Sequence, residues 1–176
     1  MSIKHELQNI ISGNGSVRNG KIIQTITDYL RREKKAISAT EETKFSKDQE
    51  TEVLVKFITH SNLWYSNIDS SKYIGEGAEQ RVYEFSDPNY ILKLNDSIFY
   101  AYWEDYFNSL LLHNYFFPHL AYELLGFIAT EAKLGNGAKN SWCFFVKLFL
   151  YSFRRSEEEV SSAGVHLTSN RIYHEK

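Results

Sequence analysis

The chain has 176 residues, of which 43% are hydrophobic, and its formal net charge is −2. This length fits one ordinary domain, or a small domain with an extension. The charge gives no reason to expect nucleic acid or an anionic membrane as a partner.

The cysteine content and the lack of long apolar runs indicate the compartment. The only cysteine, Cys143, excludes an internal disulfide framework, and we interpret it as a small buried hydrophobe in a reducing cytoplasm. Neither a signal peptide nor an apolar run of about 18 residues is visible, so a soluble cytoplasmic protein is expected.

Residues 1–60 are predicted to form a helical segment. Apolar residues recur at helical spacing in residues 2–11 and 21–35. A third helix is predicted to open at Ser46, because Gln49 three residues later completes a capping-box signature.

The polar stretch between the second and third helices, residues 36–46, is expected to be a mobile linker. The second helix ends in a basic cluster, which either contacts phosphates or is a solvated helix end: Arg31, Arg32, Lys34 and Lys35.

A glycine-containing hairpin is predicted near the middle of the chain. Gly75 and Gly77 separate two short strand-like runs, so the backbone at the tip either approaches a phosphate closely or simply turns. A turn signal from Ser86 to Asn89 follows, and the next strand carries one cation, Lys93. This is the order at the start of protein kinases, where the glycine loop covers ATP and the lysine holds its phosphates.

The kinase loop pattern GxGxxGxV is matched only in part, because Gln80 stands where the third glycine is expected. The V-A-I-K pattern is matched loosely by Tyr90 to Lys93. The residues that we expect to form the nucleotide site are Gly75, Glu76, Gly77, Ala78, Gln80, Val82 and Lys93, together with Glu104 on the helix that follows.

Residues 97–117 form the longest predicted helix, with an N-cap signal at Asn95-Asp96-Ser97 and a stop at Pro118. Its expected apolar side holds Phe99, Trp103, Tyr106, Leu110 and Phe117. In a kinase this helix carries the acidic partner of the lysine. Glu104 is the first candidate for that ion pair and Asp105 the second, although either is also explained as an exposed acid on an amphipathic helix.

Two apolar, aromatic runs, residues 121–132 and 141–151, are separated by a glycine-containing stretch. They predict an antiparallel hairpin with a flexible tip. The predicted fold is therefore α+β: an N-terminal helical segment, then a five-stranded antiparallel sheet with one long helix in the element order of a protein kinase N-terminal lobe. This lobe is assigned to residues 61–151.

Four segments resemble the kinase-like domain of bacterial polyvalent proteins, which are associated with mobile elements: Ile68-Asp69, Glu76 to Tyr83, Leu92 to Asp96 and Asp105 to Asn114. The resemblance covers roughly residues 15–150. It implies ATP as a ligand, with Gly75, Gly77 and Lys93 as nucleotide contacts.

The groups that transfer phosphate in kinases are not recognisable. No Asp occurs after Asp105, so the metal-binding Asp residues and the catalytic loop are missing, and Mg²⁺ is expected only with a complementary C-terminal lobe. Residues 152–176 lack a core pattern and are interpreted as a truncated or flexible tail. The protein is then an ATP-binding lobe without activity alone, or a non-enzymatic module whose sheet and aromatic C-terminal run bind another protein.

Other chemistry has little support. His113 and His119 flank Pro118, and His166 and His174 lie near the C-terminus, but none has further ligands at a spacing suited to a metal.

Overall fold

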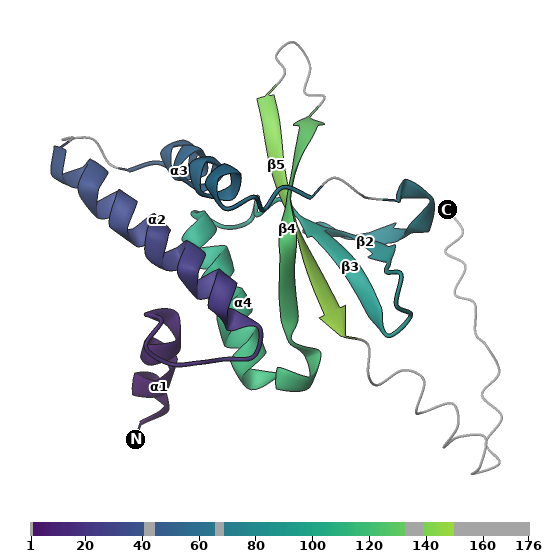
Figure 1. The fold of residues 1–176 in the computed structure, drawn as a ribbon, viewed down its shortest axis with the longest axis horizontal. Helices are drawn as coiled ribbons and strands as arrows, with labels where there is room; N and C mark the ends of the chain where they lie inside the picture. Colours follow the sequence, from purple (N-terminus) through teal and green to yellow (C-terminus); the bar gives the residue numbers. More distant parts are fainter. Residues whose placement is uncertain (1, 41–44, 66–68, 133–138, 150–176) are drawn as a thin grey trace, which may run out of the picture.

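The computed structural model describes residues 2–40, 45–65, 69–132 and 139–149. Four α-helices lie on one side of an antiparallel sheet (Figure 1). The predicted combination of an N-terminal helical part, an antiparallel sheet and one later helix is confirmed. The tail at 152–176 and the side chain of Cys143 lie outside the described part.

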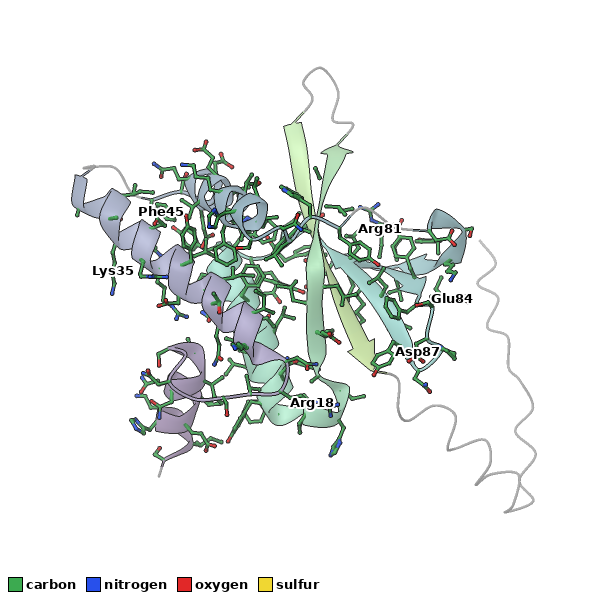
Figure 2. All side chains as sticks on the ribbon, viewed as in Figure 1. Arg18, Lys35, Phe45, Arg81, Glu84 and Asp87 are labelled. Atoms are coloured by element: carbon green, nitrogen blue, oxygen red, sulfur yellow. The ribbon has the colours of Figure 1, made fainter. Side chains whose placement is uncertain are left out.

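The helices are α1 (Ile3–Ile11), α2 (Gly20–Thr40), α3 (Lys47–His60) and α4 (Trp103–Phe116). They share one apolar core with the fourth strand, and side chains crowd the space between them (Figure 2). Each such side chain stabilises the fold by about 1.5–3 kcal/mol. Those at most 1% exposed include Ile23, Ile26, Leu30, Phe107 and Leu111.

Helix α2 is longer than predicted. Residues 36–40, expected to be a linker, continue the helix, because Ile37 packs against the shared core. Phe45, at the other end of the predicted linker, is buried. Residues 41–44 lie outside the described part.

Helix α3 begins as predicted. The Ser46 side chain accepts a hydrogen bond from the Gln49 backbone N–H, and the Gln49 side chain accepts one from the Ser46 backbone N–H. Both local signals belong to the capping box, and they fix where the helix starts.

The strands are β1 (Tyr73–Glu76), β2 (Gln80–Glu84), β3 (Tyr90–Asn95), β4 (Tyr122–Ala132) and β5 (Lys139–Phe149). They form one sheet in the order β1-β2-β3-β5-β4, and every neighbouring pair is antiparallel. The predicted hairpin of β4 and β5 is confirmed; its tip, residues 133–138, lies outside the described part. Between β2 and β3, Asp87 accepts hydrogen bonds from the backbone and side chain of Asn89, so the predicted turn is confirmed.

The two faces of the sheet differ. On one face, Tyr83, Leu92 and Leu94 form a small apolar cluster. The other face carries Lys93, and it looks toward α4, because Lys93 contacts Tyr122 and the Tyr122 ring packs on His113 of α4.

Helix α4 begins later than predicted. Asn95 and Asp96 accept hydrogen bonds from the backbone N–H groups two residues ahead, which makes turns, and Ser97 has a positive φ of 54°. The predicted N-cap is therefore wrong, and the helix begins at Trp103. Its end before Pro118 is confirmed. Phe99 and Phe117, predicted on its buried side, are exposed.

A close backbone approach ties the helical part to the sheet. Leu63 and Tyr65 exchange backbone hydrogen bonds with Phe127 of β4. A Cβ atom added at Gly126, where β4 is bulged, would lie 2.7 Å from the Leu63 carbonyl oxygen. Glycine is required there because the two backbones touch.

Candidate functional site

The predicted nucleotide contacts form a row across three strands. Gly75 of β1 pairs with Val82 of β2, and Val82 pairs with Lys93 of β3. Directly paired residues point to the same face of a sheet. The structure therefore brings these three residues together on the face that looks toward α4.

The hairpin tip closes tightly, since the Gly77 N–H donates to the Gln80 carbonyl at 3.0 Å. Neither Gly75 nor Gly77 has a positive φ, and a Cβ added at either would meet no atom within 4 Å. Neither turn geometry nor packing within the described residues therefore demands glycine at these positions. What the glycines provide is an uncovered backbone, which a ligand can approach.

Two hollows flank the tip. One, of about 250 Å³, lies along the hairpin and is lined by Glu76 to Arg81 with Leu94 and Asp96. The other, of about 200 Å³, lies between the hairpin and α4. Its lining residues are Glu79, Gln80, Asn95, Tyr100, Tyr106, Ser109, Leu110, His113 and Tyr122.

Lys93 does not line the second hollow itself, but it contacts Tyr122, which does. Its Nζ atom donates to the Tyr122 hydroxyl at 3.3 Å and lies 5.4 Å from the centroid of the Tyr122 ring. A cation and a hydroxyl thus meet at the edge of a polar hollow that faces the glycine hairpin. Ammonium and hydroxyl groups both donate hydrogen bonds to phosphate oxygens.

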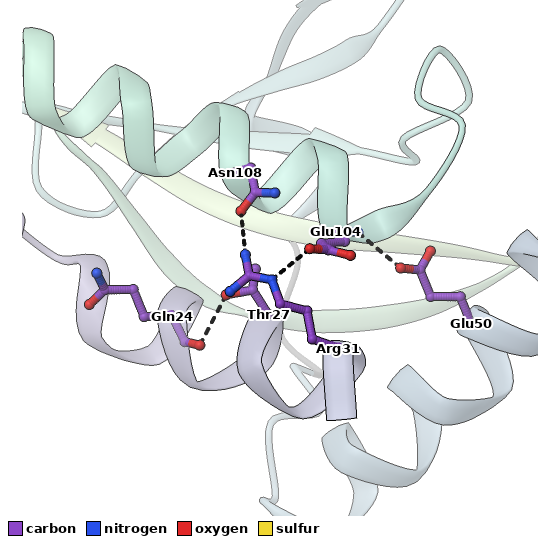
Figure 3. A network of polar contacts seen from close by, with 6 residues as sticks. All are labelled: Gln24, Thr27, Arg31, Glu50, Glu104 and Asn108. Atoms are coloured by element: carbon purple, nitrogen blue, oxygen red, sulfur yellow. Dashed lines mark hydrogen bonds and ion pairs between the residues drawn. The ribbon is translucent and has the colours of Figure 1, made fainter. Parts of the chain in front are cut away.

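Glu104 does not lie with Lys93. Its Oε1 atom accepts from Arg31 Nε of α2 at 2.6 Å, and Arg31 also donates to Asn108 at 3.0 Å (Figure 3). The ion pair predicted between Glu104 and Lys93 is replaced by this pair between α2 and α4. Asp105, the second candidate, is exposed.

Helix α3 fixes the start of α4. The Glu50 carboxylate accepts from the backbone N–H of Glu104 at 3.2 Å (Figure 3) and from that of Trp103 at 2.6 Å. These bonds place negative charge at the helix N-terminus. Burial raises the pKa of the Glu50 carboxyl, and these two hydrogen bonds oppose the rise. Lys47 donates to the carbonyls of Ser97 and Tyr100 just before the helix.

Burial also shifts the pKa of Tyr106, which lines the second hollow. It raises the pKa of the Tyr106 hydroxyl well above its usual value, and the nearby Tyr122, Tyr100 and Glu79 add to the rise. Tyr106 therefore stays a neutral hydroxyl at neutral pH. Glu79 is exposed at the hairpin tip, so the hollow has one acidic wall.

The remaining predicted contacts are divided. Glu76, Gly77 and Ala78 line only the hollow along the hairpin, whereas Gln80 lines both hollows.

Among the described residues, no cluster of three His, Cys, Asp or Glu side chains is arranged to hold a metal ion. In this same part of the chain, no helix is long and apolar enough to cross a membrane.

Sequence reasoning missed Tyr122, Tyr106 and Glu79 as parts of the site. Glu79 lies within the glycine loop motif, so its place in the chain is a signal that could have found it. Tyr122 and Tyr106 reach the site through the packing of α4 and β4, and no local pattern marks them.

Comparison with known protein families identifies a family to which this chain is similar. A family model described as serine/threonine/tyrosine kinase found in polyvalent proteins matches residues 47–140, just over half of the chain. Searches of curated proteins and of solved structures give no match.

Proposed function

Because the chain belongs to the family of serine/threonine/tyrosine kinases found in polyvalent proteins, we propose that its sheet and α4 act as the ATP-binding lobe of a kinase-like domain. The glycine hairpin lies over the phosphates, and Lys93 contacts them. Val82, which is directly paired with Lys93, lies beside the bound nucleotide.

The observation that carries this proposal is the row formed by Gly75, Val82 and Lys93. The glycine loop and the lysine follow each other in the order found in kinases. In the fold they also lie on one face of the sheet, the face that looks toward α4. The uncovered backbone at Gly75 and Gly77 supports the same proposal, since packing does not explain these glycines.

Phosphoryl transfer requires further groups. In kinases, Asp and Asn side chains of the second lobe hold Mg²⁺, and an Asp orients the acceptor hydroxyl. The sequence contains no Asp after Asp105. We therefore expect nucleotide binding by these residues, and transfer only when a complementary C-terminal lobe supplies the metal ligands and the base.

Thermal unfolding with and without Mg-ATP tests the proposal. Ligand at about a hundredfold over its dissociation constant adds about 2.7 kcal/mol, a shift of roughly 5–10 °C for a chain of this size. Lys93→Ala is expected to abolish the shift, whereas Lys56→Ala, an exposed lysine on α3, serves as the matched control and should keep it. If saturating Mg-ATP does not shift the wild-type transition, the proposal is wrong.

A second candidate function, a non-enzymatic interaction module, is favoured by exposed apolar side chains at both ends of α4. Ile98 and Phe99 precede the helix and are 61% and 59% exposed; Phe116 and Phe117 lie at its end and are 50% and 54% exposed. Two adjacent apolar side chains are thus exposed at each end, and contiguous apolar patches often mark binding surfaces. Concentration-dependent assembly in analytical ultracentrifugation, together with no response to Mg-ATP, would favour this function over the first.

A further inference from the structure

Tyr122 is the residue that contacts Lys93 where a kinase would place a carboxylate. Lys93 Nζ contacts Tyr122 in two ways: it lies 3.3 Å from the hydroxyl oxygen and 5.4 Å from the ring centroid. The side chains of α4 that line the hollow on this side are Tyr106, Ser109, Leu110 and His113. None of these four is a carboxylate.

The position of Tyr122 is fixed from α4. The side-chain amide of Asn114, which is fully buried, accepts from the Tyr122 N–H at 2.7 Å and donates to the Tyr122 carbonyl at 2.9 Å. His113 packs on the Tyr122 ring, with 4.5 Å between the ring centroids. Backbone and ring are therefore both held, so the hydroxyl has a defined place in the hollow.

The chemistry of a phenol at this place differs from that of a carboxylate. A carboxylate would neutralise the Lys93 ammonium and would have no proton to donate. The Tyr122 oxygen accepts from Lys93, and its own O–H remains a donor. The pair thus presents an ammonium and a hydroxyl donor together, which suits an anionic oxygen atom.

We propose that Tyr122 is a phosphate-binding residue that orients Lys93 and donates its own hydroxyl proton, as a hydrogen bond, to the same phosphate group of the bound nucleotide. This inference rests on the proposed function, because it concerns the same site. It adds a ligand contact that comes from β4, outside the glycine hairpin and the lysine strand.

Calorimetric titration of wild type and Tyr122→Phe tests the inference. The variant keeps the aromatic ring, its packing on His113 and both bonds to Asn114, and loses only the hydroxyl. The ligands are Mg-ATP, magnesium inorganic triphosphate and adenosine, and magnesium is included because the Glu79 carboxylate lines the same hollow. Tyr115→Phe, at an α4 residue outside the hollow lining, is the matched control.

Loss of one hydrogen bond to a charged oxygen should weaken Mg-ATP and magnesium triphosphate by about tenfold in Tyr122→Phe. Adenosine, which has no phosphate, should bind both proteins equally. Unchanged Mg-ATP affinity in Tyr122→Phe would overturn the role of Tyr122 and leave the proposed function standing. Equal weakening of adenosine would also overturn it, because the loss would then be structural. If wild type binds neither Mg-ATP nor triphosphate, the proposed function fails and the inference fails with it.

Discussion

Removal of the Asn114 amide is predicted to lower the free energy of unfolding more than removal of any other polar side chain of α4. It is fully buried and makes three hydrogen bonds to backbone groups: to the Arg18 carbonyl at 2.9 Å, and to the carbonyl and N–H of Tyr122. Asn114→Ala leaves all three groups without this partner. Each hydrogen bond contributes about 0.5–1.5 kcal/mol, and a buried group left unpaired costs about 1–3 kcal/mol. The sum over three groups, allowing partial relaxation, is about 3–5 kcal/mol.

Urea unfolding followed by circular dichroism measures this loss. The matched control is Asn108→Ala on the same helix, where a partly exposed amide accepts one hydrogen bond from Arg31 and the expected loss is about 1 kcal/mol. A domain of this kind has only about 5–15 kcal/mol of stability, so Asn114→Ala should be visibly marginal. If the two variants lie within about 0.5 kcal/mol of each other, the reasoning from unpaired backbone groups is refuted.

Two further predictions concern the glycine hairpin and the start of α4. Gly75→Ala and Gly77→Ala should keep the unfolding free energy or raise it by up to about 1 kcal/mol, because an added Cβ meets no atom there. Both variants should nevertheless be stabilised less by Mg-ATP than wild type. A loss of stability above about 2 kcal/mol would show that the fold requires these glycines. Burial raises the pKa of the Glu50 carboxyl above 4.5. The contribution of Glu50 to stability is therefore greatest below that pH, and it is lost as the pH rises through the pKa that Glu50 has in the folded state. The stability of wild type minus that of Glu50→Gln should therefore fall with rising pH in urea titrations, and a flat difference would contradict the shift.

Local signals predicted the parts of the fold that depend on near neighbours. The Ser46 capping box, the turn at Asp87 and the stop at Pro118 all act within four residues, so the sequence displays them directly. The positions of the glycine hairpin and Lys93 were predicted on the same grounds, because β1, β2 and β3 follow one another in the chain and are joined by short turns.

The interactions that position α4 were not predictable in this way. Glu50 is 53 residues from Trp103, and Arg31 is 73 residues from Glu104. Asn114 is 96 residues from Arg18. Each partner is chosen by how the helices pack, and no spacing within α4 identifies it. The predicted N-cap failed for the same reason, since the polar groups at Asn95 and Asp96 make a turn and the helix is capped from α3 instead.

The same packing explains why Glu104 does not reach Lys93. Successive residues of an α-helix are about 100° apart, so Glu104 and Tyr106 point about 200° apart around α4. Tyr106 lines the hollow next to the sheet, and Glu104 points to Arg31 of α2. Turning α4 far enough to bring Glu104 to Lys93 would expose Phe107. It would also break the hydrogen bond from the Trp103 N–H to Glu50 and the one from the Tyr122 N–H to Asn114. The packing of α4 therefore directs Glu104 to Arg31 and prevents the ion pair with Lys93. It leaves Tyr122, which is not a carboxylate, as the contact of Lys93.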